Sequence, residues 1–111
     1  IKTEFTDTTD LFANPMVFEI LVSNLFLNAI RHNHINGSIL VSVTNRTMTF
    51  ANTGKPNALA QDKLFKRFAK TNPSEQGNGL GLAIIKKIAD MNGWTISYTF
   101  TNSLHVFSVM F

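Results

Sequence analysis

Three glycines alternate with other residues directly before an apolar segment that is typical of a helix. They are Gly77, Gly79 and Gly81 in the run GNGLGL, and residues 83–89 follow them. Glycine at a helix start costs stability relative to alanine, so this density of glycine indicates a demand on the backbone. One interpretation is a turn that offers bare amide N–H groups and the positive helix end to a phosphate. A flexible loop with a glycine cap explains the run equally well.

A stripe of polar side chains runs along a second, mostly apolar helical segment, expected from about Pro15 to His32. Asn24 and Asn28 lie four residues apart and Arg31 or His32 follows, so these side chains share one helix face. Because asparagine is a poor helix former and a buried amide needs partners, the stripe could serve a hydrated Mg²⁺ and a phosphate. A solvent-facing side of an amphipathic helix is the alternative.

The elements that must position these residues follow from hydrophobic period and capping signals. Asn14-Pro15 is typical of a helix start, and Gly93 is placed as a left-handed cap after the second helix. Two pairs of alternating segments predict two hairpins. The expected order is an extended segment at 1–6, a helix to about 32, strands at 38–44 and 47–51, a helix from about 79 to 92, and strands at 94–100 and 104–111. It favours an α/β two-layer sandwich, with helices covering one face of a mostly antiparallel sheet.

Bulk composition narrows the class of protein. The 111 residues predict one domain over 1–111, and 44% hydrophobic with 15% charged residues fits a globular core. No apolar run reaches the ~18 residues that a membrane span needs. The absence of cysteine removes thiolate metal sites, and a net charge of +3 does not indicate nucleic acid binding. Because the chain begins with Ile1 rather than Met, we expect a fragment of a longer protein.

The stretch from 52 to 78 is long, polar and irregular, which is typical of a functional or mobile segment. It holds half of the chain's ten basic residues: Lys55, Lys63, Lys66, Arg67 and Lys70. Only Asp62 and Glu75 oppose them. Such a field favours a polyphosphate ligand, although a solvated basic loop gives the same composition.

These motifs occur in the order found in one known family. Residues 24–33 resemble the asparagine box of sensor histidine kinases, 52–56 a variant of their first glycine box, 64–68 their phenylalanine box and 77–82 their second glycine box. Each box alone is weak, whereas the ordered set covers the chain from about Asp10 to Phe111. The chain therefore resembles the ATP-binding catalytic domain of two-component sensor kinases. The resemblance implies the Bergerat fold, a mixed sheet with helices on one face.

The resemblance assigns roles on the first helix. It implies that Asn28 ligates a Mg²⁺ that bridges the ATP phosphates, with Asn24 supporting it from one turn earlier. Arg31 stands where a basic residue faces the phosphates, and these three form the expected catalytic group. His32 stands where an aromatic ring lies near the nucleotide.

The other expected ligands of ATP come from the two glycine boxes and the basic stretch. Asn52 stands where an aspartate accepts a hydrogen bond from the adenine amino group, and Gly54 would let the backbone approach the base. Residues from about 55 to 78 would form a lid. The resemblance implies that the lid and the second helix contact the phosphates through Arg67, Lys70, Gly77, Gly79, Leu80 and Gly81.

Two positions depart from the family pattern, and a third bears on the type of reaction. Asn52 replaces the aspartate, and an amide can present a donor as well as an acceptor. Pro56 replaces a glycine, which fixes φ and removes an N–H. Asn24 stands where ATPases of the wider superfamily carry a glutamate that acts as a general base for water. Because an amide cannot take a proton at neutral pH, the chain fits a phosphoryl donor better than a hydrolase.

The expected function is therefore binding of Mg-ATP and donation of its γ-phosphate to a histidine on a separate dimerisation and phosphoacceptor domain, which passes it to a response regulator. The alternative is a degenerate, non-catalytic nucleotide-binding or docking module of the same fold. We expect a cytoplasmic domain without nucleic acid or membrane contact of its own, and the anchoring of the parent protein stays open. A Rossmann turn would need a preceding strand, and no P-loop Gly-Lys-Ser/Thr exists. His32, His34 and His105 lack zinc-type spacing and the flanking pattern of a phosphoacceptor.

Overall fold

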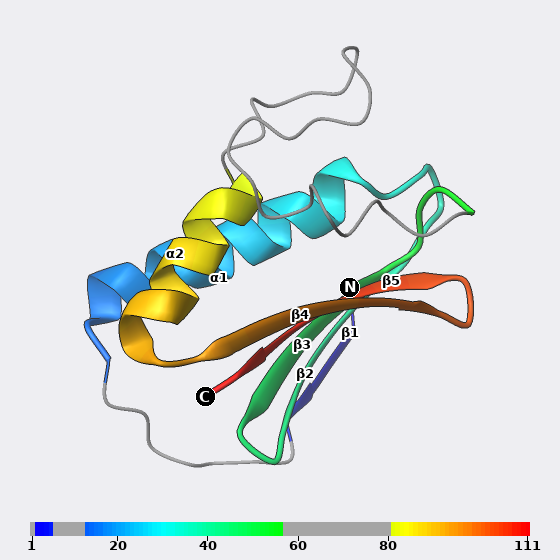
Figure 1. Ribbon diagram of the computed structural model, residues 1–111. Coiled ribbons are helices and arrows are strands. Elements are labelled where there is room, and N and C mark those ends of the chain that lie inside the picture. Colours follow the sequence, from blue (N-terminus) through cyan, green and yellow to red (C-terminus); the bar gives the residue numbers. More distant parts are fainter. Residues whose placement is uncertain (1, 6–12, 57–80) are drawn as a thin grey trace.

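In the computed structural model, which describes residues 2–5, 13–56 and 81–111, two helices lie side by side on one face of a five-stranded sheet (Figure 1). This arrangement confirms the predicted two-layer α/β sandwich. The elements are β1 (Lys2–Phe5), α1 (Pro15–Arg31), β2 (Ile39–Thr44), β3 (Thr47–Asn52), α2 (Gly81–Asn92), β4 (Thr95–Thr101) and β5 (Leu104–Met110). Each agrees with its predicted range to within a few residues.

The sheet is mixed, and its strand order is β1-β2-β3-β5-β4. The edge strand β1 runs parallel to β2, and every other neighbouring pair is antiparallel. The last strand of the chain, β5, lies between β3 and β4. As a result, the final residue of β3, Asn52, is the register partner of His105 near the start of β5.

The start of α1 is capped as its sequence predicts. The side-chain oxygen of Asn14 accepts hydrogen bonds from the backbone N–H groups of Met16, at 2.9 Å, and Val17, at 3.4 Å. Pro15 occupies the first helical position, where its missing N–H is not needed. These contacts fix where α1 begins.

The end of α2 is a glycine cap with two hydrogen bonds. Gly93 has φ 71°, its N–H donates to the Asp90 carbonyl at 3.3 Å, and the Trp94 N–H donates to the Ala89 carbonyl at 2.8 Å. This is the Schellman arrangement, which favours glycine at the left-handed position. It turns the chain so that Trp94 packs edge-on against Phe111, with ring centroids 5.0 Å apart.

Both hairpin turns place two residues other than glycine at positive φ. Asn45 and Arg46 have φ 49° and 58°, and Asn102 and Ser103 have φ 52° and 63°. Two-residue turns with positive φ at both positions match the twist of antiparallel strands, and asparagine tolerates this conformation well. The turns therefore hold the predicted hairpins in register.

The hydrophobic core lies between the helical layer and the sheet. One face of each helix supplies small and branched side chains, and the sheet supplies two phenylalanines and several aliphatic residues. Its fully or nearly fully buried members include Leu21, Leu25, Ala29, Val41, Phe50, Ile85, Ile88, Ala89, Phe107 and Val109. This packing ties both helices to the strands that carry the site.

A second apolar face of α1 is exposed. Met16, Ile20, Leu27 and Ile30 are 45–72% exposed and recur at spacings that place them along one stripe of the helix. The stripe explains why the whole segment is rich in apolar residues. Within the described part of the chain, neither helix has the length and hydropathy needed to cross a bilayer.

We predict that Asn14→Ala lowers the free energy of unfolding by about 1 kcal/mol, because two N–H groups at the start of α1 lose their acceptor. Urea unfolding monitored by circular dichroism measures the change. Asn14→Asp keeps an oxygen acceptor and is the matched control. Equal stability of Asn14→Ala and the wild-type chain would contradict the assigned cap.

Candidate functional site

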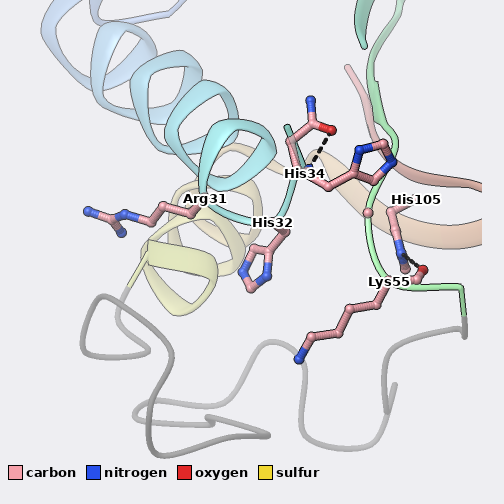
Figure 2. Close-up of a pocket in the computed structure, with 7 residues that line it drawn as sticks. Arg31, His32, His34, Lys55 and His105 are labelled. Carbon is pink, nitrogen blue, oxygen red and sulfur yellow. Dashed lines mark hydrogen bonds between the residues drawn. The ribbon is translucent and has the colours of Figure 1, made fainter. Parts of the chain in front are cut away.

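A cavity of about 250 Å³ opens beside the C-terminal end of α1 (Figure 2). It is formed by the end of α1 and the loop after it, by the chain that follows β3, and by β5. Its lining residues are Arg31, His32, Asn33, His34, Gly54, Lys55 and His105. Two of these carry a positive charge and none is acidic, so the field in the cavity favours an anionic ligand.

Three of the predicted site residues meet at this cavity: Arg31, His32 and Gly54. In Figure 2 the Arg31 guanidinium points away from the other labelled side chains. Lys55 was predicted only as part of the basic stretch. The cavity thus joins the end of the asparagine box to the start of the first glycine box.

Gly54 allows the chain after β3 to lie against the end of α1. A Cβ at this position would sit 2.4 Å from the His32 carbonyl oxygen and 3.1 Å from Cδ2 of His105. Contacts that short require backbone or ring to move, so only glycine fits. The structural demand on Gly54 thus comes from the protein's own chain.

A hydrogen-bond network ties the α1–β2 loop to the end of β3. The Thr53 hydroxyl donates to the side-chain oxygen of Asn33, and it accepts from the Ser38 N–H at 2.8 Å. The Asn33 amide donates to the Ser38 carbonyl at 3.1 Å. A Cβ on Gly37 would lie 1.9 Å from the Asn33 oxygen and 2.3 Å from the Thr53 hydroxyl, so a side chain here would displace these hydrogen-bonding groups. The network braces two walls of the cavity.

The two asparagines of α1 precede the cavity by one and two turns. Asn28 is 8% exposed, and its buried amide nitrogen has no hydrogen-bond partner within the described part of the chain. Asn24 donates from its amide to the Ile20 carbonyl at 2.8 Å, and a Cβ on Gly81 would lie 3.4 Å from its oxygen. The polar stripe therefore approaches the start of α2. The solvent-facing interpretation is wrong for Asn28.

Asn52 uses its donor locally and keeps its acceptor. The residue is 1% exposed, and its amide nitrogen donates to the Thr53 carbonyl at 2.7 Å. Because a carbonyl only accepts, this contact requires the nitrogen on that side. The side-chain oxygen of Asn52 is buried and has no hydrogen-bond partner among the described residues. The atom of this amide that lacks a partner is thus an acceptor, as an aspartate oxygen would be.

His105 belongs to the site, although the sequence predicted no role for it there. It is 2% exposed, its Nε2 donates to the Lys55 carbonyl at 2.7 Å, and its Nδ1 lies 2.7 Å from the Tyr98 hydroxyl. One feature of the sequence could have indicated that His105 has polar partners. In the alternation of β5, His105 shares the inward face with Phe107 and Val109, where a polar residue needs partners. No comparable signal marks Asn33 or His34, which simply follow α1.

The remaining predicted ligands cannot be placed in this cavity. Arg67, Lys70, Gly77, Gly79 and Leu80 lie outside the described residues, as does most of the predicted lid. Gly81 is described and is the first residue of α2. Among residues 2–5, 13–56 and 81–111, no three or more His, Cys, Asp or Glu side chains gather as a metal site. Amide oxygens and a ligand's own phosphates are the alternative donors for a hard cation.

Comparison with known proteins decides the family. The family described as histidine kinase-, DNA gyrase B- and HSP90-like ATPase matches residues 13–107. This chain belongs to that family. It is therefore an ATP-binding domain of the histidine kinase type, and the resemblance drawn from the four boxes is confirmed.

Individual relatives of this ATP-binding domain are sensor kinases. The chain is 33% identical over 101 residues to the heme sensor protein HssS of Staphylococcus aureus, which covers 86% of this chain. The match spans only 22% of that relative's length. The catalytic domain of histidine kinase ThkA has a TM-score of 0.78 at 26% identity, covering 97% of this chain and 74% of that one. The Acinetobacter baumannii histidine kinase AdeS gives 0.74 at 26% identity, covering 98% and 52%.

We predict that Gly54→Ala destabilises the domain by roughly 1–3 kcal/mol, because its methyl group overlaps the His32 carbonyl oxygen. Gly81→Ala is the matched control, since its Cβ meets only the Asn24 oxygen at an ordinary 3.4 Å. Urea unfolding of both variants measures the difference. If the two substitutions change the unfolding free energy equally, the close approach at Gly54 is not a constraint.

Proposed function

We propose that this domain binds Mg-ATP at the cavity between the end of α1 and the chain after β3, and that it donates the γ-phosphate to a histidine on a separate phosphoacceptor domain. One observation carries the proposal. Two buried amides lie close in the chain to lining residues of the cationic cavity, since Asn28 is one helical turn before His32 and Asn52 is two residues before Gly54. Each has a polar atom without a hydrogen-bond partner among the described residues. Buried polar groups are nearly always paired in folded proteins, so these atoms are expected to be satisfied by a ligand.

The base is expected on the side of Asn52. Its unpartnered oxygen can accept a hydrogen bond from the exocyclic amine of adenine. Guanine presents a carbonyl oxygen at the corresponding position, and two acceptors facing each other in a buried site repel. Since the Asn52 donor is already bound to the Thr53 carbonyl, the amide cannot easily turn to suit guanine. This local bond supports a preference for ATP over GTP.

The phosphates are expected on the side of Arg31 and the start of α2. Asn28 is the proposed Mg²⁺ ligand through its amide oxygen because of its place in the asparagine box, and its unpartnered amide nitrogen is a donor that suits a phosphate oxygen. Bound Mg²⁺ would neutralise charge on the phosphates during transfer. Asn24 and Gly81 lie against each other where the two helices approach. The further proposed phosphate contacts are Arg31, His32, Arg67, Lys70, Gly77, Gly79 and Leu80, with Gly54 on the base side.

The chemistry proposed is in-line phosphoryl transfer. The bond between the γ-phosphorus and the β–γ bridging oxygen breaks, a bond to an imidazole nitrogen of the partner histidine forms, and ADP leaves. No side chain of this domain needs to take a proton from water, which agrees with an amide at Asn24. The domain contributes position and charge, and these are the main contributions of proteins to phosphoryl transfer.

The partner domain is expected outside this chain, which spans about a fifth of the length of the curated relatives it matches. The exposed apolar stripe of α1 supports the presence of a protein partner, because contiguous exposed apolar residues commonly mark interaction surfaces. A response regulator is the proposed recipient of the phosphoryl group. The alternative, a nucleotide-binding module without transfer, is favoured by Pro56 and Asn52. Transfer from labelled ATP to the histidine of the parent protein distinguishes the two.

Asn28→Ala is expected to weaken ATP binding roughly tenfold in the presence of Mg²⁺ and to have little effect in its absence, because it removes the proposed metal ligand. Titration with a fluorescent ATP analogue, with Mg²⁺ and with a chelator, measures both affinities. Asn92→Ala is the matched control, since it removes an amide that bonds the Ile88 carbonyl on the other helix. An Asn28→Ala domain with unchanged Mg²⁺ dependence would remove Asn28 from the metal site.

The base preference predicts that the wild-type domain binds ATP more tightly than GTP and that Asn52→Leu abolishes the difference. Leucine keeps the volume of the side chain but offers no acceptor to the adenine amine. Competition of ATP and GTP against the same fluorescent analogue measures the ratio. Thr49→Val on the same strand removes a hydroxyl paired with Ser108 and should leave the ratio unchanged. A wild-type domain without preference would show that Asn52 does not contact the base.

A further inference from the structure

A chain of hydrogen bonds runs from β4 through β5 to the segment after β3. The Tyr98 hydroxyl lies 2.7 Å from Nδ1 of His105, and Nε2 of the same ring lies 2.7 Å from the Lys55 carbonyl oxygen. The three residues are far apart in the sequence. The sheet order, which inserts β5 between β3 and β4, brings them together.

The Lys55 carbonyl determines the state of the ring. A carbonyl oxygen only accepts, so Nε2 of His105 must carry the hydrogen. In the neutral ring Nδ1 is then an acceptor, and the Tyr98 hydroxyl donates to it. Tyr98 therefore selects the tautomer that can bind Lys55, in the way that an outer partner fixes a histidine ring in many sites.

Packing alone does not require a histidine here. The ring lies on the inward face of β5 with Phe107 and Val109, and its centroid is 4.8 Å from that of Phe100. An apolar side chain of similar size would fill the same space. Histidine instead places two polar nitrogens in the core, and both have hydrogen-bond partners, the Tyr98 hydroxyl and the Lys55 carbonyl. The polarity of His105 thus serves the segment that it binds.

That segment forms one wall of the cavity. Gly54 is enclosed between the His32 carbonyl oxygen and the His105 ring, so closely that no Cβ fits, and the next residue supplies the carbonyl that His105 binds. Two residues before Gly54 stands Asn52, the register partner of His105, with its unused acceptor. One side chain therefore contacts the wall and adjoins the proposed base acceptor.

We propose that His105 is the positioning residue of the base side of the nucleotide cavity, holding the Gly54–Lys55 backbone against the end of α1 while Tyr98 holds the ring. The inference rests on the proposed function for the identity of the ligand. His105 acts on the base side because it adjoins Asn52 and Gly54, whereas Arg31 and the start of α2 belong to the phosphate side. The His105 ring itself transfers neither a proton nor a phosphoryl group.

Three variants test separately the parts of the hydrogen-bond chain from Tyr98 through His105 to Lys55. His105→Phe keeps the ring and loses both nitrogens, and Tyr98→Phe loses only the orienting hydroxyl. His105→Gln keeps an amide donor near the position of Nε2 and is the rescue variant. Ser108→Ala, three residues along the same strand, removes a hydroxyl paired with Thr49 and is the matched control.

Two ligands and one ligand-free measurement test the proposal. ATP and inorganic tripolyphosphate, each with Mg²⁺, are titrated in competition against a fluorescent ATP analogue. The ¹⁵N NMR order parameter of the Lys55 amide, measured without nucleotide, reports whether the backbone of the wall is held. Circular dichroism melting checks that each variant is folded.

We expect His105→Phe to weaken ATP binding about tenfold, the scale of one lost organising hydrogen bond, and to leave tripolyphosphate affinity unchanged. Tyr98→Phe should weaken ATP binding in the same direction, and His105→Gln should recover most of the loss. The order parameter of Lys55 should fall in His105→Phe and Tyr98→Phe. Ser108→Ala should match the wild-type chain in every measurement.

Equal loss for ATP and tripolyphosphate would overturn the proposal, because it would show a general effect on folding or on the phosphate side. Wild-type ATP affinity and a wild-type Lys55 order parameter in a folded His105→Phe variant would overturn it as well. If the wild-type domain binds no ATP, the proposed function fails. The Lys55 order parameter in the ligand-free variants then still decides whether His105 holds the wall.

Discussion

The close approach of the chain after β3 to the C-terminal end of α1 is the constraint on which the cavity depends. The backbone at Gly54 lies so close to the His32 carbonyl oxygen that a Cβ atom would not fit between them. Glycine at this position makes the approach sterically allowed. On one side the Asn33–Ser38–Thr53 network braces the approach, and on the other side the His105 ring does so. These contacts connect the helical layer to the sheet at the cavity.

The polar groups of the site differ in how they are satisfied. His105 has partners for both nitrogens, so it serves the structure of the cavity. Asn28 and Asn52 each leave one buried polar atom without a partner. An unpaired buried group costs about 1–3 kcal/mol, and the extensive core between helices and sheet must compensate for two of them. A domain that carries this cost at the edge of a cationic cavity is organised for a ligand with complementary donors and acceptors.

Asn52 shows why a residue type alone does not define its chemistry. By composition an amide differs from the aspartate of related kinases, because it can donate as well as accept. The bond from its nitrogen to the Thr53 carbonyl fixes the orientation of the amide, and the buried oxygen is the atom without a partner among the described residues. A neighbouring backbone group thus orients the asparagine so that it offers an acceptor without a buried charge.

The sequence by itself determined the elements, the caps at Asn14 and Gly93, the two-layer class and the family. These features depend on hydrophobic period, local capping chemistry and motif spacing, all of which are read within a few residues. Only the tertiary structure decided the insertion of β5 between β3 and β4, and with it the pairing of Asn52 with His105. It also decided which amide atoms have partners and which groups His105 contacts. The physical reason is that hydrogen-bond partners and close approaches join segments distant in the chain, and no local pattern specifies which of them meet.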